Sequence, residues 1–260
     1  MLPLFLKPYN VEINSLIRIG PNSDGGYVIH RDSINLTKKI ISCGLSDDWR
    51  FEKNFVELNK NCSITAYDHT IDKNFWFQRF KKDIIHFFLL KKLRWSKIIK
   101  IFDYLDYIKF FTDKNKHHLK KIVKNSKKDN EISMHEVLQN VEEIILKIDI
   151  EGSEYDILSD ITKNSKKIVS LIIEFHNLQK NLNKIENFII ENKSLKLIHI
   201  HGNNWKDIDT DGNPNDVELT FVNIDKINVT NEKSEKNYPI PGIDYKNFKR
   251  KNDIQLNFHE

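Results

Sequence analysis

The stretch Ile144–Leu158 reads IILKIDIEGSEYDIL, and this pattern decides the fold. Its first half is short, apolar and rich in β-branched residues, as in a strand buried on both faces of a parallel sheet. The second half is predicted to be a helix. Acids beside Ser153 would occupy its first turn, and Tyr155, Leu158 and Ile161 recur at helical spacing. A buried strand followed directly by a helix indicates an α/β protein.

Two acids, Asp149 and Glu151, stand at the carboxyl end of this strand, where Gly152 turns the chain. Open α/β sheets bind their ligands at such ends. Carboxylates there can orient a substrate hydroxyl, bind a divalent metal or accept a proton. The alternative is a strand-to-helix turn with a purely structural role, and this segment alone leaves both interpretations open.

Composition narrows the class of protein. The 260 residues are 39% hydrophobic and 11% aromatic, which excludes wholesale disorder and suits one domain, with or without an insertion. The 41 basic and 37 acidic residues give a mixed surface that does not indicate a nucleic-acid partner. Cys43 and Cys62 have no disulfide or metal spacing, so we expect buried thiols. No signal peptide or membrane-spanning run is found, which predicts a cytoplasmic protein.

Residues 16–29 are predicted to form a hairpin. Asp24-Gly25-Gly26 is a strong turn signal because glycine tolerates positive φ. Paired glycines also let a backbone approach a ligand closely, and Tyr27 would flank that ligand. A plain hairpin and a ligand-binding turn are both compatible with the pattern.

The segment from residue 39 to residue 68 is predicted to form a strand, a helix and a second strand. The first strand ends at Gly44, the helix carries Phe51, Phe55 and Leu58 on one face, and the second strand ends at Asp68. Such a βαβ unit is typical of nucleoside binding, with the glycine under the ligand and the acid on both ribose hydroxyls. A single glycine, where the phosphate-binding fingerprint has three, favours a nucleoside without a pyrophosphate.

Residues 72–131 interrupt the alternation with a basic, aromatic segment, predicted to be a helical insertion. It could serve as a lid over an active site, as an interfacial helix on an anionic membrane, or as a packed or dimer-forming helix. Stacking on single-stranded nucleic acid lacks a supporting motif. Within the insertion, residues 107–112 are predicted to form an edge strand and residues 113–131 a solvated helix and loop.

Three predicted strands in succession end in polar side chains. They are Asp149 and Glu151; Glu174, His176 and Asn177; and His201, Asn203 and Asn204. Because the carboxyl ends of parallel strands share one rim, these groups are expected to converge although the sequence separates them. Imidazoles with carboxylates suit a divalent metal, and they suit general-base catalysis equally well.

Two motifs carry a resemblance to a known family. Leu146–Leu158, followed by Ile172–His176, resembles the FkbM-type S-adenosylmethionine-dependent methyltransferases, and the likeness extends from Ile40 to Asn223. The resemblance implies a single domain with a Rossmann-like seven-stranded sheet. The sheet would be mostly parallel with an antiparallel last strand and would carry helices on both faces. The implied activity is O-methylation, frequently of sugars or glycosylated metabolites, with S-adenosyl-L-methionine as cofactor.

The resemblance also implies roles for single residues. By position, Gly44 would lie under the methionine part of the cofactor, Asp68 would bind its ribose, and Asp149 would lie near the reacting centre. We expect the turn formed by Asp24, Gly25, Gly26 and Tyr27 to complete the cofactor site. The glycine loop after residue 43 is poorer than the family pattern.

The acceptor must be aligned and deprotonated. We expect His176 or His201 to be the base, with Asp149 and Glu174 orienting the acceptor or holding a metal together with His201. The residues expected to bind the acceptor, a sugar hydroxyl of a nucleotide sugar or surface-polysaccharide precursor, are Glu151, Asn177, Asn203 and Asn204. Two alternatives remain. One is a metal-dependent sugar-nucleotide transferase, and the other is a non-catalytic Rossmann-like binding module attached to a membrane or partner through residues 72–108.

Overall fold

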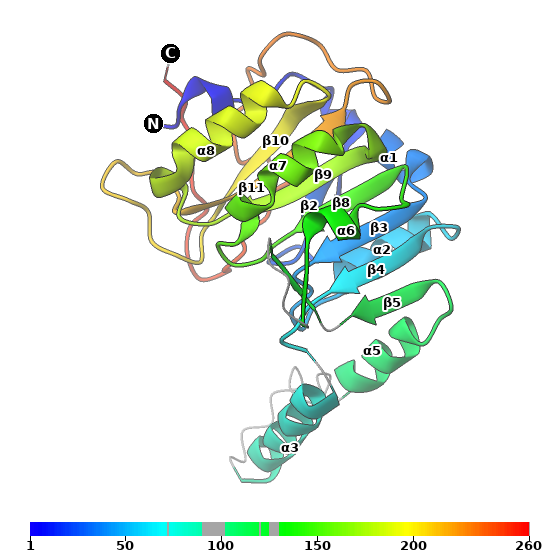
Figure 1. Cartoon of the computed structure of the whole chain (residues 1–260). Helices are drawn as coiled ribbons and strands as arrows, with labels where there is room; N and C mark the ends of the chain where they lie inside the picture. The colour runs from blue at the N-terminus through cyan, green and yellow to red at the C-terminus, as the bar shows by residue number, and fades with distance from the viewer. Residues whose placement is uncertain (72, 90–101, 120, 125–129, 260) are drawn as a thin grey trace.

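A seven-stranded sheet forms the centre of the molecule in the computed structural model, which describes residues 1–71, 73–89, 102–119, 121–124 and 130–259 (Figure 1). The strand order is β10-β11-β9-β8-β3-β4-β5. The bounds are β3 Lys39–Cys43, β4 Ser63–Tyr67, β5 Lys116–Leu119, β8 Ile144–Ile148, β9 Ile168–Phe175, β10 Leu195–Asn203 and β11 Asp216–Asn223. Only β11 runs antiparallel within this sheet, between β9 and β10. The predicted sheet, mostly parallel with an antiparallel last strand, is confirmed.

The central strands β8 and β9 are mostly apolar because both of their faces are covered. All residues of β8 and β9 are buried. Successive side chains point to opposite faces of a sheet, so Ile145 and Ile172 join one core while Leu146 and Leu171 join the other. A strand with a core on each side shows a continuous apolar run instead of alternation.

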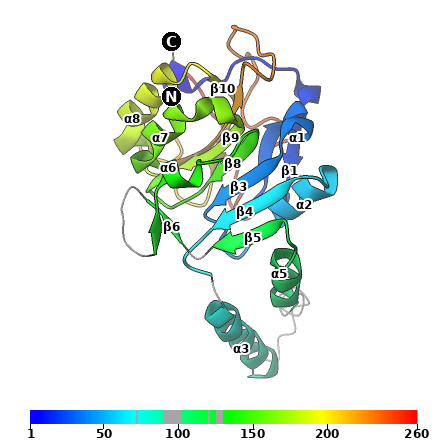
Figure 2. The same cartoon turned by 45° about the vertical axis from the view of Figure 1, so that its right-hand side comes forward.

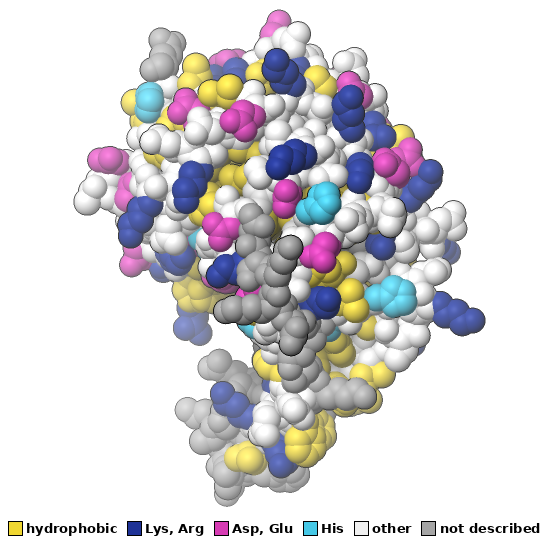
Figure 3. Space-filling model, in the orientation of Figure 1, with side chains coloured by type: hydrophobic (Ala, Val, Ile, Leu, Met, Phe, Trp, Pro, Cys, Tyr) yellow, Lys and Arg dark blue, Asp and Glu magenta, His cyan; other side chains and the backbone are white. Residues whose placement is uncertain are grey.

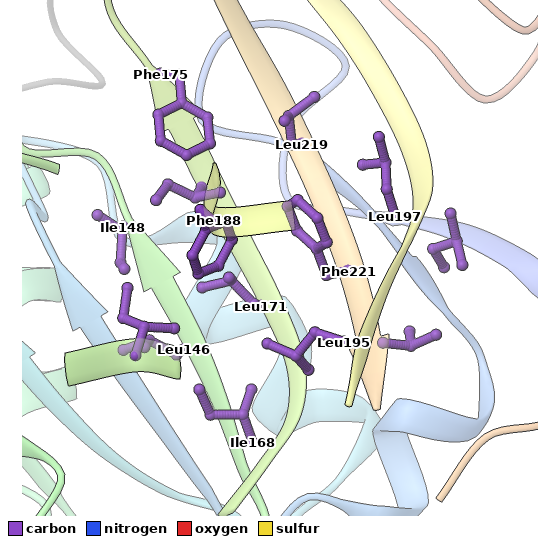
Figure 4. Packing of buried hydrophobic residues seen from close by; sticks show 14 of the residues in the cluster. Leu146, Ile148, Ile168, Leu171, Phe175, Phe188, Leu195, Leu197, Leu219 and Phe221 are labelled. Atoms are coloured by element: carbon purple, nitrogen blue, oxygen red, sulfur yellow. The ribbon is translucent and has the colours of Figure 1, made fainter. Parts of the chain in front are cut away.

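Helices cover both faces of the sheet, as predicted (Figures 1 and 2). On one face lie α6 (Met134–Val137), α7 (Leu158–Lys163) and α8 (Leu178–Glu191). In this core the rings of Phe188 and Phe221 meet edge to face, with their centroids 5.7 Å apart (Figure 4). On the other face lie α1 (Asp32–Leu36) and α2 (Arg50–Leu58). Short 3-10 helices occupy Leu4–Leu6 (η1), Ile13–Ser15 (η2) and Ser165–Lys167 (η4).

The predicted hairpin is present as β1 (Leu16–Ile19) and β2 (Tyr27–His30), paired antiparallel. Its connection, residues 20–26, is longer than the tight turn that the glycines suggested. Arg18 folds over this loop and donates hydrogen bonds from Nε to the Pro21 carbonyl (3.0 Å) and from Nη2 to the Ser23 carbonyl (2.8 Å). The hairpin therefore presents a braced loop beside the rim of the sheet.

The connections of the sheet open a crevice between β3 and β8. From β3 the chain continues to β4 on one side, and β8 pairs with β3 on the other, so this is a topological switch point. Gly44 follows β3 with a φ of +84°, and a Cβ at this position would lie 1.6 Å from the carbonyl oxygen of Asp149. Only glycine permits this close approach of the two strand ends.

The region of the predicted insertion contains both helices and strands. Its elements are α3 (Lys73–Leu89), α5 (Asp103–Phe111), β5, β6 (Ile122–Val123) and β7 (Glu131–Ile132). The helical content is confirmed, but the predicted edge strand at 107–112 is wrong, because these residues lie within or just after α5. Tyr104, Tyr107 and Phe111 recur at helical spacing, and Tyr104 and Tyr107 pack on Trp76. The true edge strand is β5, where the sequence predicted a solvated helix and loop.

Exposed apolar side chains lie on α3 and α5, as they do on other parts of the described surface (Figure 3). Phe77 is 53% and Leu105 61% exposed. The roles of lid, membrane contact or dimer contact stay predictions, and the parts of them that fall on residues 72, 90–101, 120 and 125–129 lie outside the described residues. No described helix is both long and apolar enough to cross a membrane.

Candidate active site

Three cavities of the described chain meet at Asp149, which lines all of them. The Asp68 cavity (about 300 Å³) is also lined by Gly44, Ser46, Asp68, Thr70, Ile122, Glu151 and Ser153. The hairpin cavity (about 460 Å³) is lined by Asp24, Gly25, Tyr27, Asp48, Arg50, Lys147, Trp205 and Asn247, among others. The His176 cavity (about 340 Å³) is lined by Asp24, Glu151, Glu174, His176, Asn203, Trp205, Lys206 and Asp216.

The imidazole of His176 lies at the centre of an acidic cluster. Its Nε2 is 3.8 Å from Asp149 Oδ1, 3.8 Å from Glu174 Oε1 and 3.5 Å from Glu151 Oε2. The side chain is buried, and among the described residues Nε2 has no hydrogen-bond partner. The predicted convergence of Asp149, Glu151, Glu174 and His176 at one rim is therefore present in the structure.

Glu154 sets the orientation of this imidazole. Its carboxylate is fully buried, and Oε1 accepts hydrogen bonds from the backbone N–H of His176 (2.7 Å) and from Nδ1 (3.1 Å). The other oxygen accepts from the Gly152 N–H (2.8 Å). With the proton held on Nδ1, the lone pair of Nε2 points toward the carboxylates.

The predicted start of the helix that follows Gly152 is wrong, because Glu154 has this buried role. Residues Glu154–Asp156 form a 3-10 turn, η3, and α7 begins only at Leu158. The sequence predicts Glu154 in the first turn of the helix, where its charge would suit the positive helix end. It points inward instead, because it satisfies two backbone N–H groups and a ring nitrogen.

Burial and mutual repulsion perturb the titration of the cluster. Burial raises the pKa of Asp149 to about 6, against the opposing charges of Lys147 and His176. Burial, with the carboxylates of Asp149 and Glu218, also raises the pKa of Glu174 well above its usual range. Burial lowers the pKa of His176, but the hydrogen bond to Glu154 and the surrounding carboxylates outweigh it, so this pKa is raised. The cluster can therefore take up and release a proton near neutral pH.

Asp216 belongs to the same site, although the sequence did not single it out. It is the first residue of β11, and its carboxylate lines the His176 cavity and pairs with Lys206 Nζ at 2.8 Å. Because β11 is antiparallel, its beginning lies at the rim where the parallel strands end. The predicted direction of the last strand was the signal that could have identified this residue.

The cluster has the donors of a divalent-metal site. One ligand atom each from Asp149, Glu151 and His176 lie within 4.8 Å of one another, and so do those of Glu174, His176 and Asp216. Carboxylate oxygens with an imidazole nitrogen suit first-row divalent metals. The predicted metal set of Asp149, Glu174 and His201 is corrected, because the imidazole at this place belongs to His176.

His201 lies away from the three cavities, in a buried ion pair. Its Nδ1 is 3.3 Å from Glu218 Oε2 and its Nε2 is 3.2 Å from Asp253 Oδ1. Burial opposes the charged form, but these two carboxylates raise its pKa to about 10. An imidazolium with both nitrogens engaged cannot accept a proton or ligate a metal. We therefore remove His201 from the predicted base and ligands.

Two of the four predicted acceptor-binding residues also have structural roles. Asn204 is buried, and its amide holds the C-terminal segment through the Phe248 and Asn252 carbonyls, at 3.1 Å each. Asn177 is exposed at the start of α8 and donates its backbone N–H to Asp216 (3.0 Å). Neither lines the three cavities. Glu151 and Asn203 do, and Asn203 donates to Glu174 (2.7 Å).

Of the predicted hairpin residues, Asp24, Gly25 and Tyr27 line the hairpin cavity. Gly26 does not line it. Its glycine is required for packing, since a Cβ there would lie 2.1 Å from the Pro21 carbonyl oxygen. The cofactor prediction for this loop therefore keeps three of its four residues as candidates.

Asp68 lies in the expected place but is already fully hydrogen-bonded. Its Oδ2 accepts from the N–H groups of Leu45 (2.9 Å) and Ser46 (2.8 Å), and its Oδ1 accepts from the N–H and hydroxyl of Thr70 (2.7 and 2.6 Å). Burial raises its pKa, but these bonds outweigh burial and lower it. Asp68 thus ties together the loops after β3 and β4, and binding both ribose hydroxyls would require some of these bonds to break.

The comparisons with known proteins show likeness at the level of solved structures. No family model and no curated protein matches the chain. It is similar to the precorrin-6Y C5,15-methyltransferase of Geobacter metallireducens, with 10% identity over 74% of this chain and 86% of that one and a TM-score of 0.37. The TYW2 of M. jannaschii, solved in complex with AdoMet, is 9% identical over 75% of this chain and 74% of that one, with a TM-score of 0.35. At these values the likeness assigns no family.

Proposed function

We propose that the protein is an S-adenosyl-L-methionine-dependent O-methyltransferase in which His176 is the general base. The observation that carries the proposal is the Nε2 of His176. The residue is buried and lines a cavity that borders Asp149, and none of the described residues makes a hydrogen bond to this nitrogen. The Asp68 cavity is also lined by Asp149. A methyl donor and a hydroxyl acceptor in these two cavities would meet at that residue.

The residues present fit this cofactor. The strand-end crevice at Gly44 and Asp149 is where open α/β sheets bind nucleotides, and both residues line the Asp68 cavity. Gly44 would lie under the methionine part and the Asp68 cavity would hold the nucleoside. The cofactor would supply a methyl group that its sulfonium already activates.

The protein's own residues would then align and deprotonate the acceptor. Asp149 and Glu174 can accept hydrogen bonds from its hydroxyl groups, and alignment of two reactants contributes about 7–11 kcal/mol at its best. His176 Nε2 takes the hydroxyl proton, which is worth about 10²–10⁴-fold in rate. Glu154 stabilises the resulting imidazolium through Nδ1, at 3.1 Å.

The lining of the His176 cavity favours a neutral acceptor with several hydroxyl groups. Asp149, Glu151, Glu174 and Asp216 offer hydrogen-bond acceptors, and Asn203 adds an amide. These carboxylates would repel an anion at the reacting position. A half-exposed Trp205 adds an apolar face at the same cavity. We propose a sugar as the acceptor, carried by a nucleotide sugar or a surface-polysaccharide precursor.

The carboxylate and imidazole donors around His176 also support a metal-assisted form of the reaction. A divalent metal held by Asp149, Glu151 and His176 would lower the pKa of an acceptor hydroxyl. The same cluster supports a second candidate, a metal-dependent sugar-nucleotide transferase. That enzyme would bind a nucleoside diphosphate sugar as donor and would not bind S-adenosylmethionine.

Calorimetric titration separates these candidates. We expect the wild-type protein to bind S-adenosylmethionine and S-adenosylhomocysteine, with or without a chelator. His176→Gln should keep this affinity and lose transfer to sugar-nucleotide acceptors, while His135→Gln, on the exposed surface of α6, should keep both. Absence of binding to either compound would refute the proposed cofactor. Full transfer by His176→Gln would refute the proposed base.

A further inference from the structure

The hairpin cavity contains a buried ammonium group that the proposed chemistry does not use. Lys147 lies in β8, where every other residue from Ile144 to Ile148 is apolar, and its side chain is 4% exposed. Burying a lysine charge is costly unless the group is paired and hydrogen-bonded. A lysine at this position therefore needs a partner.

The described residues satisfy the hydrogen-bonding capacity of the Lys147 ammonium only in part. Lys147 Nζ donates one hydrogen bond, to the Gly44 carbonyl at 3.2 Å. The nearest carboxylate oxygen, Oε1 of Glu52, is 3.8 Å away, beyond hydrogen-bond distance, and the Tyr27 ring lies below the ammonium at 5.2 Å. An ammonium has three protons to donate, so two have no hydrogen-bond partner among the described residues.

Glu52 does not complete the pair. It is fully buried, its Oε1 accepts a hydrogen bond from the Ser42 hydroxyl, and its Oε2 has no partner in the described part of the chain. The carboxylate neutralises the charge of Lys147 at a distance without taking up its protons. The ammonium remains available on the side that lines the hairpin cavity.

The other charges of this cavity point to a zwitterionic ligand. Asp24 and Asp149 place carboxylates on its wall. The other two acids there, Asp47 and Asp48, are paired with Arg79 and Arg50, and the cations Lys249 and Arg250 are exposed. Arg50 also lines the cavity, but it is already bound to Asp48 through Nε and Nη2. One buried cation facing two carboxylates matches the carboxylate and ammonium of an α-amino acid.

The position of the cavity identifies that amino acid with one end of the proposed cofactor. Ser46 and Asp149 line both the hairpin cavity and the Asp68 cavity, and Gly44, whose carbonyl accepts a hydrogen bond from Lys147, lines the Asp68 cavity. A ligand that extends from one cavity into the other passes over this point. We infer that Lys147 binds the carboxylate of the cofactor's methionyl end, with Asp24 and Asp149 facing its ammonium. This inference rests on the proposed function.

The test compares two ligands that differ only in the carboxylate. S-adenosylhomocysteine is titrated against 5′-deoxy-5′-(3-aminopropylthio)adenosine, its decarboxylated analogue. Charge-assisted hydrogen bonds at a buried site correspond to about tenfold to a hundredfold in affinity, so the wild-type protein should prefer S-adenosylhomocysteine by that factor. In Lys147→Met the preference should fall to near unity, while affinity for the analogue stays the same or rises.

Two further variants act as controls. Lys147→Arg should retain part of the preference. Lys53→Met removes a lysine of α2 that pairs with Asp106 outside the three cavities, and it should keep the full preference. Equal affinity of the wild-type protein for both ligands would overturn the inference and leave the proposed function standing. An unchanged preference in Lys147→Met would also overturn the inference and leave the proposed function standing. Failure of both ligands to bind the wild-type protein would overturn the inference and the proposed function together. The wild-type comparison decides even if Lys147→Met does not fold.

Discussion

Replacing Glu154 by glutamine should lower the pKa of His176 and change which ring nitrogen carries the proton. In the wild-type protein, Glu154 Oε1 accepts from Nδ1 at 3.1 Å, and both side chains are buried. Hydrogen bonds to charged groups contribute about 1.5–3 kcal/mol, and one pKa unit corresponds to about 1.4 kcal/mol. The substitution should therefore lower the pKa of His176 by about one to two units.

The pKa shift also fixes the pH dependence of stability. The pKa of His176 is raised in the folded protein, so its contribution is fully present below the unfolded value of 6.5 and is lost as pH rises through the folded value. Glu154→Gln should consequently lower the free energy of unfolding more at acidic pH than at alkaline pH. The Gly152 N–H, which Glu154 also binds, adds a loss that does not depend on pH.

Imidazole ¹⁵N correlation spectra recorded from about pH 5 to about pH 9 measure the pKa and the tautomer directly, without an acceptor substrate. Of the ten histidines, His176 is assigned by its absence in His176→Gln. Glu151→Gln is the matched control. Its side chain is 84% exposed and 3.5 Å from Nε2, so the expected shift is below one unit, as for exposed pairs worth about 0–1 kcal/mol. An unchanged His176 pKa and tautomer in Glu154→Gln would refute the assigned role of this carboxylate.

Four further outcomes are expected. His201→Gln should lower the free energy of unfolding by about 3–5 kcal/mol in urea titrations, because it breaks a buried ion pair. Its affinity for S-adenosylhomocysteine should not change. A loss of affinity without a loss of stability would restore His201 to the site. Gly44→Ala should lose both stability and this affinity, whereas Gly242→Ala, with similar φ but open space around it, should lose only about 1–3 kcal/mol; equal losses would contradict the close approach to Asp149. Asp68→Asn should be less stable than the wild-type protein at pH 7, and the difference should shrink as pH falls through the lowered pKa of Asp68; a difference independent of pH would argue against its ionised role. Mn²⁺ added to chelator-treated protein should broaden the ring signals of His176 before those of His201, and the reverse order would exclude the metal site.

The strand predictions succeeded where one local pattern had one structural meaning. The apolar run before Asp149 is buried on both faces, and the strands ending near His176 and Asn203 are where their composition placed them. Local pattern misled the prediction at 107–112. There, β-branched and aromatic residues suggested a strand, but Tyr104 and Tyr107 pack on Trp76 at helical spacing.

The choice between the two candidate histidines shows the limit of a linear pattern. His176 directly follows β9, and His201 lies in β10 two residues before its end, in the same sheet. The two histidines differ in their partners. Asp253, from the distant C-terminal segment, binds Nε2 of His201. Glu154 binds Nδ1 of His176 and leaves its Nε2 open. Neither partner is implied by strand periodicity.

By itself the sequence determined the buried central strands and the rim where polar side chains gather, because the length of an apolar run depends only on neighbours along the chain. The antiparallel last strand was implied by the family resemblance, and the edge strand β5 was not predicted. The tertiary structure decided which of those side chains remain available. Lys147, Glu154 and Asp216 entered the site, and His201 and Asn204 left it, because the pairing of buried charges depends on segments that meet only after folding.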